Sequence, residues 1–150
     1  MNECEIVLIE DNPADVYLVQ LALKENNVNC HLTTFRNGQE AVRSLCQPAE
    51  TQIIPNVILL DLNTPKSDGF EVLIRLRGTP HLANVPIAIV TSSQATSDKA
   101  RTARLGVIRY VHKPSQLEEF IATVGQAVKE MLSQVNPPGR AGKLANSDQN

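Results

Sequence analysis

Three short apolar runs, one loosely alternating stretch and a further strand candidate recur along the chain, each followed by polar residues. The runs at 5–9, 57–60 and 87–91 show almost no polar alternation, which is typical of strands buried on both faces in a parallel sheet. The segment 107–111 is a fifth strand candidate. The stretch at 29–35 alternates loosely and carries β-branched and aromatic residues, which predicts a strand at an edge. The pattern therefore predicts five strands.

Helical periodicity fills the segments between these runs. Asn12, Pro13 and Asp15 form a helix-start signal, which predicts a helix over about 13–25. The clearest helix is predicted over 115–135, where apolar residues recur at steps of three and four for five turns. Shorter helices are predicted over 39–45, 70–78 and 99–105.

Alternating strands and helices predict an α/β fold. Five strands and five helices imply parallel pairing with right-handed crossovers, and hence a doubly wound sheet with helices on both faces. The length of 150 residues suits one domain, which we expect over 1–135. The run 136–150 is rich in Gly, Ser, Asn and Gln without an apolar pattern, so a flexible C-terminal tail is expected there.

The charge balance and hydropathy exclude some classes of partner. Fourteen basic residues nearly balance sixteen acidic ones, so there is no basic footprint that would indicate nucleic acid binding. No stretch resembles a signal peptide, and no apolar run approaches the roughly 20 residues that a membrane helix needs. The protein is expected in the cytoplasm, without a membrane segment.

The cysteines and histidines show no metal-ligand spacing. Cys4, Cys30 and Cys46 are scattered, and an odd count suits a reducing compartment. We expect buried or unreactive thiols. The histidines are equally far apart, so a zinc site is not expected; they are His31, His81 and His112.

Chemically useful side chains follow the predicted strands. Glu10 and Asp11 come after the first strand, Asp61 after the third, Thr91 ends the fourth and Lys113 follows the fifth. In a flavodoxin-like strand order of 2-1-3-4-5 these groups converge at the carboxyl edge of the sheet. Three converging carboxylates repel one another unless a cation joins them, and Mg²⁺ prefers such oxygen ligands. The threonine and lysine could bind phosphoryl oxygens, which would leave the central aspartate as a nucleophile.

These residues resemble the receiver domain of two-component response regulators over about residues 4–132. The resemblance implies that Asp61 accepts a phosphoryl group from a histidine kinase, and that Thr91 and Lys113 bind its oxygens. It also implies a Mg²⁺ site formed by Glu10, Asp11, Asp61 and the backbone carbonyl of Asn63.

The resemblance carries further implications for individual residues. Tyr110 matches the family's switch aromatic, which turns inward when Thr91 moves. The Lys113–Pro114 bond matches one that is cis in the family, and Asn63 and Ser93 match positions that tune dephosphorylation. A homodimer through the fourth helix, fifth strand and last helix is a further implication of the resemblance.

Two sequence segments, 61–73 and 86–93, are similar to those of small regulators that pair with phytochrome-type histidine kinases. Because the chain ends soon after the last predicted helix, no DNA-binding effector is expected, and the output would pass through another protein or through self-association.

Three alternatives share parts of this pattern. A flavin-binding domain has the same predicted fold, but its phosphate loop would replace the acidic segment 10–15. A haloacid-dehalogenase-type phosphatase also forms an aspartyl phosphate, but Asn63 stands where its second aspartate, the general acid, would be. A receiver-like module that binds partners without phosphorylation is the third. The expectation is a switch that acts only on its own phosphoryl group, with slow self-dephosphorylation, rather than an enzyme.

Overall fold

The computed structural model describes residues 4–47, 54–64, 68–92 and 96–135. Within these residues one parallel sheet has the strand order β2-β1-β3-β4-β5. The predicted tail at 136–150 lies outside the described residues. The strands are β1 (Glu5–Ile9), β2 (His31–Phe35), β3 (Val57–Leu60), β4 (Ile87–Thr91) and β5 (Arg109–His112).

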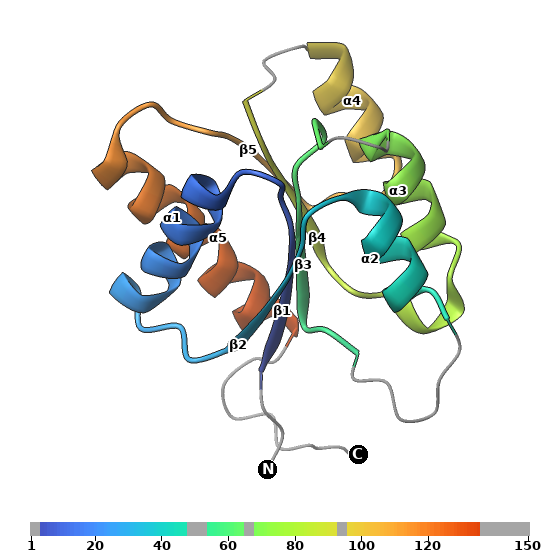
Figure 1. Ribbon diagram of the computed structural model, residues 1–150, viewed down its shortest axis with the longest axis horizontal. Coiled ribbons are helices and arrows are strands. Elements are labelled where there is room, and N and C mark those ends of the chain that lie inside the picture. Colours follow the sequence, from blue (N-terminus) through green and yellow to red (C-terminus); the bar gives the residue numbers. More distant parts are fainter. Residues whose placement is uncertain (1–3, 48–53, 65–67, 93–95, 136–150) are drawn as a thin grey trace.

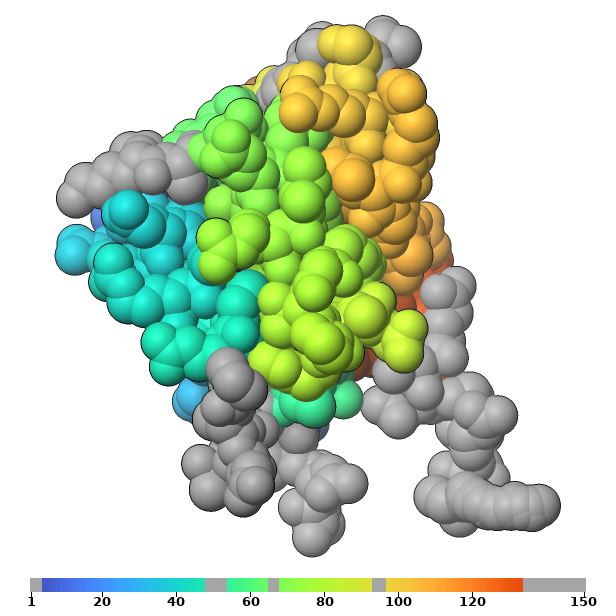
Figure 2. Space-filling model, turned by 90° about the vertical axis from the view of Figure 1, so that its right-hand side faces the viewer, coloured from blue at the N-terminus to red at the C-terminus, as the bar shows by residue number. Residues whose placement is uncertain are grey.

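Helices cover both faces of the sheet, which confirms the predicted doubly wound α/β fold (Figure 1). Helices α1 and α5 lie on one side, and α2, α3 and α4 on the other; Figure 2 shows the second side, with α2, α3 and α4 next to one another. The helices are α1 (Pro13–Glu25), α2 (Gly38–Leu45), α3 (Gly69–Arg77), α4 (Thr96–Arg104) and α5 (Leu117–Val135), with a short 3₁₀ helix, η1 (Pro80–Leu82), before β4.

The core is divided by the sheet into two layers. Along β1, Ile6 and Leu8 face the side of α1 and α5, whereas Val7 and Ile9 face the side of α2 and α3. All of β3 is buried, as its continuous apolar run predicts, whereas the edge strand β2 is only half-buried. The buried strands β1, β3 and β4 bring the polar residues Glu10, Asp61 and Thr91 to the edge of the sheet where these strands end.

Two local features shape the loops at the carboxyl edge. The side chain of Asn12 accepts a hydrogen bond from the backbone N–H of Ala14, and Pro13 is the first residue of α1, so this helix begins directly beside the end of β1. A Cβ atom on Gly69 would lie 2.6 Å from the Cα of Leu62. Only glycine therefore allows α3 to approach the loop that follows β3 this closely.

Helix α4 is held mainly by polar contacts. Among its residues whose side chains the structure describes, Thr102 is the buried one. The Arg101 guanidinium lies over the Phe70 ring of α3, 3.9 Å from its centroid. Arg77, at the end of α3, donates to the carbonyl of Leu105 just beyond α4. The helix thus lacks the apolar stripe that fixes the other helices.

The expectation of three unreactive thiols was wrong for two of them. Cys4 and Cys30 form a disulfide, and Cys46 is the free thiol of the described residues. The two bonded cysteines directly precede the paired residues Glu5 and His31 of β1 and β2, which brings their Cα atoms to 4.5 Å. The register of β1 and β2 brings Cys4 and Cys30 together, whereas their sequence separation of 26 does not by itself indicate a disulfide. In the part of the chain that the structure describes, no helix has the length and hydropathy to cross a membrane.

Candidate functional site

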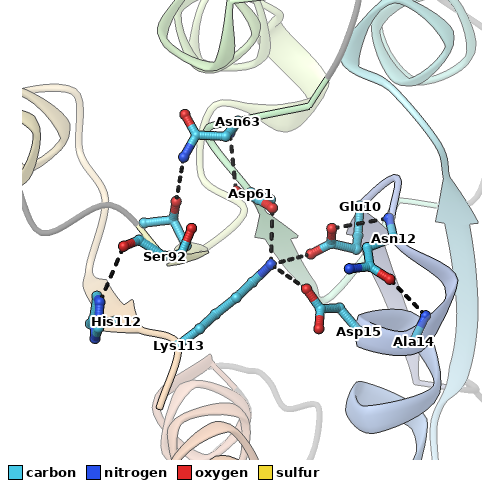
Figure 3. A network of polar contacts seen from close by, with 10 residues as sticks. Glu10, Asn12, Ala14, Asp15, Asp61, Asn63, Ser92, His112 and Lys113 are labelled. Carbon is cyan, nitrogen blue, oxygen red and sulfur yellow. Dashed lines mark hydrogen bonds and ion pairs between the residues drawn. The ribbon is translucent and has the colours of Figure 1, made fainter. Parts of the chain in front are cut away.

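The polar groups predicted at the strand ends meet at the carboxyl edge of the sheet. Glu10 and Asp61 follow the central strands β1 and β3, Thr91 ends β4, and Lys113 follows β5. Glu10, Asp61 and Thr91 are buried, with 3%, 6% and 0% exposure. Figure 3 shows the Lys113 side chain reaching across the edge toward the carboxylates.

Lys113 is the electrostatic centre of the site. Its Nζ donates to Glu10 Oε1 at 2.8 Å, to Asp61 Oδ2 at 3.0 Å and to Asp15 Oδ2 at 2.7 Å. The second oxygen of Glu10 accepts from the backbone N–H of Asn12, and that of Asp61 accepts from the backbone N–H of Asn63. Each buried carboxylate thus has one charged and one neutral donor, which offsets much of its desolvation cost.

Asn63 links the carboxylate of Asp61 to Thr91. Its backbone N–H binds Asp61 Oδ1 at 3.0 Å, and its side-chain amide donates to Thr91 Oγ1 at 3.3 Å. The sequence predicted only a carbonyl ligand and a dephosphorylation role for this residue. The amide contact is an additional connection between β3 and β4 at the site.

Burial and charge shift two pKa values here. Burial raises the pKa of Glu10 to about 7; the hydrogen bond from Lys113 opposes this rise, and the charge of Asp61 adds to it. Burial alone would lower the pKa of Lys113, but its hydrogen bonds to Asp15 and Glu10 and the charge of Asp61 raise it above its usual range. The ammonium therefore stays charged at neutral pH.

Glu10, Asp11 and Asp61 form a cluster suited to a divalent cation. Each offers one carboxylate oxygen, and these oxygens lie within 4.8 Å of one another. Hard cations such as Mg²⁺ and Mn²⁺ prefer such oxygen donors. The donor set fits a metal of this class. That Glu10, Asp11 and Asp61 are its ligands, with the carbonyl of Asn63 as a fourth, stays a prediction.

The predicted cis bond before Pro114 was wrong. The described residues contain no cis peptide bond, so Lys113–Pro114 is trans. A trans bond before proline is favoured by about 0.5–1 kcal/mol unless a tight turn requires the cis form.

Three other residues considered in the sequence analysis are Tyr110, His112 and Ser93. Tyr110 is half-buried and packs against the core on the side of α2 and α3, while its role as a switch stays a prediction. His112 donates from Nε2 to the carbonyl of Ser92 at 3.1 Å. Ser93 lies outside the described residues.

Asp15 is the site residue whose role the sequence did not reveal. From the sequence, Asp15 is accounted for as an acidic residue in the first turn of α1, where a negative charge is stabilising. The structure adds the contact with Lys113, the shortest of the three carboxylate contacts of this ammonium. The position of Asp15 just after β1 could have indicated that it lies at the same edge, but the contact depends on the reach of Lys113.

Known proteins share this fold and sequence pattern. A family model described as the response regulator receiver domain matches residues 6–125. The response regulator Rcp1 of Synechocystis sp. (strain ATCC 27184 / PCC 6803 / Kazusa) is 37% identical over 121 residues, which cover 79% of this chain and 82% of Rcp1.

Two solved structures are similar over nearly the whole chain. The phosphorylated cyanobacterial phytochrome response regulator RcpA has a TM-score of 0.82 and 34% identity, with 92% of this chain and 100% of that chain covered. The Mn²⁺-bound form of Rcp1 has a TM-score of 0.80 and 35% identity, with 91% and 99% covered. The fold, the convergent strand ends and these matches together show that the chain belongs to the response regulator receiver family.

Proposed function

We propose that this receiver domain accepts a phosphoryl group on Asp61 from a histidine kinase, in the cytoplasm and with Mg²⁺. The observation that carries the proposal is the double placement of Asp61, which belongs to the acidic cluster and also pairs with Lys113. One carboxylate is thereby next to a cation site and an ammonium group, the two kinds of charge that stabilise a transferring phosphoryl group.

Receiver domains of this family bind a divalent metal. In this chain Glu10, Asp11 and Asp61 would hold Mg²⁺, with the carbonyl of Asn63 as a further ligand. When bound, the ion neutralises charge on the phosphoryl oxygens. Lys113 and the hydroxyl of Thr91 would bind the remaining oxygens.

The proposed step is a transfer between two side chains. An Asp61 oxygen attacks the phosphorus of a phosphohistidine, the P–N bond breaks as the P–O bond forms, and the imidazole nitrogen leaves with the bonding pair. Asn63 cannot donate a proton as a carboxylic acid would, so the site lacks the second acid that the phosphatase alternative needs. Slow hydrolysis of the aspartyl phosphate then resets the switch.

The proposal is tested with a small acyl phosphate donor such as acetyl phosphate. In the presence of Mg²⁺ the intact protein is expected to gain one phosphoryl group by mass spectrometry, and EDTA is expected to prevent the gain. An unchanged mass with Mg²⁺ and donor would overturn the proposal. Rapid, continuous release of phosphate from a phosphomonoester would favour the phosphatase instead.

A phytochrome-type histidine kinase is the proposed phosphoryl donor in the cell. Support comes from the similar structures, one of which is described as a cyanobacterial phytochrome response regulator and another as a bacteriophytochrome response regulator. The latter, RtBRR, is 31% identical, with 97% of this chain covered.

The proposed switch leads from the site to an output surface. Phosphoryl binding would draw Thr91 from its hydrogen bond with Asn63, and Tyr110 would turn into the space that Thr91 leaves. We define the output surface as α4, β5 and α5 together with Ile108, which directly precedes β5. It includes the Arg109–Glu130 ion pair and the half-exposed Ile108 and Leu117. A homodimer through this surface is part of the proposal.

Substitution of Ile108 with arginine is expected to weaken phosphorylation-dependent dimerisation, because the change puts a charge on the output surface. Sedimentation velocity with and without a phosphoryl mimic such as beryllofluoride measures the effect. Ile74→Arg is a matched control, since Ile74 on α3 is 49% exposed and Ile108 is 47% exposed. A wild-type protein that stays monomeric in both states would contradict the dimer.

Mg²⁺ affinity is expected to fall as the pH falls from 8 to 6. Burial holds the pKa of Glu10 at about 7, and a proton competes with the metal for this carboxylate. For a group with this pKa the dissociation constant should rise about tenfold between these pH values. Calorimetric titration measures it, and Glu10→Gln should bind more weakly with a flattened pH dependence; equal wild-type affinity at both values would contradict the prediction.

A further inference from the structure

Lys113 has three carboxylate partners of two different kinds. Glu10 and Asp61 belong to the acidic cluster that also includes Asp11. Asp15 also contacts the ammonium, at 2.7 Å, but is not a member of that cluster. Figure 3 shows Asp15 reaching Lys113 from the first turn of α1, beside Glu10.

Metal binding would affect the contacts of Lys113 with Glu10 and Asp61 but not its contact with Asp15. A divalent cation that takes oxygens of Glu10 and Asp61 brings positive charge next to the Lys113 ammonium, and like charges repel strongly when partly buried. The Lys113 side chain is only 12% exposed, so moving it into water would give up much of its packing. Asp15 offers an anionic partner that the metal does not take.

The start of α1 fixes the position of Asp15. It lies in the first turn of α1, whose start is fixed by the Asn12 cap and by Pro13. A helix N-terminus stabilises a negative charge, and the Asp15 side chain is 22% exposed, so it remains partly hydrated. The carboxylate is therefore held in place independently of the metal ligands.

The geometry points to Asp15 as a positioning residue for Lys113. It holds the ammonium when a divalent metal occupies the acidic cluster, and so removes Lys113 from competition for Glu10 and Asp61 while keeping it beside Asp61. This inference rests on the proposed function, because the metal and the phosphoryl group give the position of Lys113 its importance.

A double-mutant cycle with Mg²⁺ as the probe tests the inference. Asp15→Asn in the wild-type background leaves Lys113 paired with Glu10 and Asp61, and should raise the Mg²⁺ dissociation constant about tenfold. In a Lys113→Met background the same change removes only a nearby charge, so the increase should be at least threefold smaller. Asp15→Glu keeps the charge and should restore much of the wild-type affinity.

Three further measurements separate positioning from a general loss of structure. In Mg²⁺-loaded protein, the Lys113 ammonium protons should exchange slowly by NMR and should become fast in Asp15→Asn. Glu71→Gln, at an exposed first-turn position of α3, should leave the dissociation constant unchanged. Thermal melting checks that each variant is folded.

The outcomes are distinguishable from failure of the proposed function. Equal increases in both backgrounds, with unchanged exchange of the Lys113 protons, would overturn the role of Asp15 and leave the metal site intact. A wild-type protein that binds no Mg²⁺ would overturn the proposed metal site, and the role of Asp15 with it.

Discussion

Replacing Asp61 with asparagine is expected to abolish phosphoryl uptake from acetyl phosphate. The amide has almost the shape of the carboxylate, so the strand end and its contact with the Asn63 backbone can remain. It lacks the negative charge and nucleophilic oxygen that form the P–O bond. Intact mass spectrometry should therefore find no phosphorylated protein under conditions that label the wild type.

Asp68→Asn is the matched control for this substitution. Asp68 is an exposed aspartate whose side chain caps α3 by accepting from the Phe70 N–H, and asparagine can make the same contact. This variant should be labelled like the wild type. Wild-type labelling of Asp61→Asn would contradict the assignment and place the phosphoryl group on another residue.

Reduction of the Cys4–Cys30 disulfide is expected to lower the free energy of unfolding by about 3 kcal/mol. The bond closes a loop with a sequence separation of 26, and its loss restores chain entropy to the unfolded state. For a domain with a total stability of about 5–15 kcal/mol, this is a large fraction. Urea unfolding with and without reductant measures the difference.

Two cysteine variants control this measurement. A protein with both Cys4→Ala and Cys30→Ala should be insensitive to reductant, whereas Cys46→Ala should keep the wild-type response because Cys46 is free. An identical unfolding midpoint in oxidised and reduced wild type would show that the bond does not constrain the unfolded chain.

Features that depend on local pattern were predictable from the sequence. The unbroken apolar run of β3 predicted a strand buried on both faces, and the alternation of strands and helices predicted a doubly wound parallel sheet. The carboxyl ends of parallel strands lie at one edge of the sheet, so the sequence alone places Asp61 and Lys113 near each other.

Features that depend on register and side-chain reach were not predictable in this way. The disulfide requires knowing which residue of β1 lies beside which residue of β2, and no local pattern contains that information. The contact between Asp15 and Lys113 spans most of the chain and depends on one flexible side chain. The family resemblance implied a cis bond before Pro114, whereas this bond is trans.

The few apolar contacts of α4 lower the free energy needed to displace this helix. A shift of this helix would uncover little apolar surface, because Thr102 is the buried side chain of its described part. A displacement of α4 therefore costs far less than one of the fully buried strand β3. In the proposed switch, the sheet would keep its shape while α4 converts a local change of charge into a different surface.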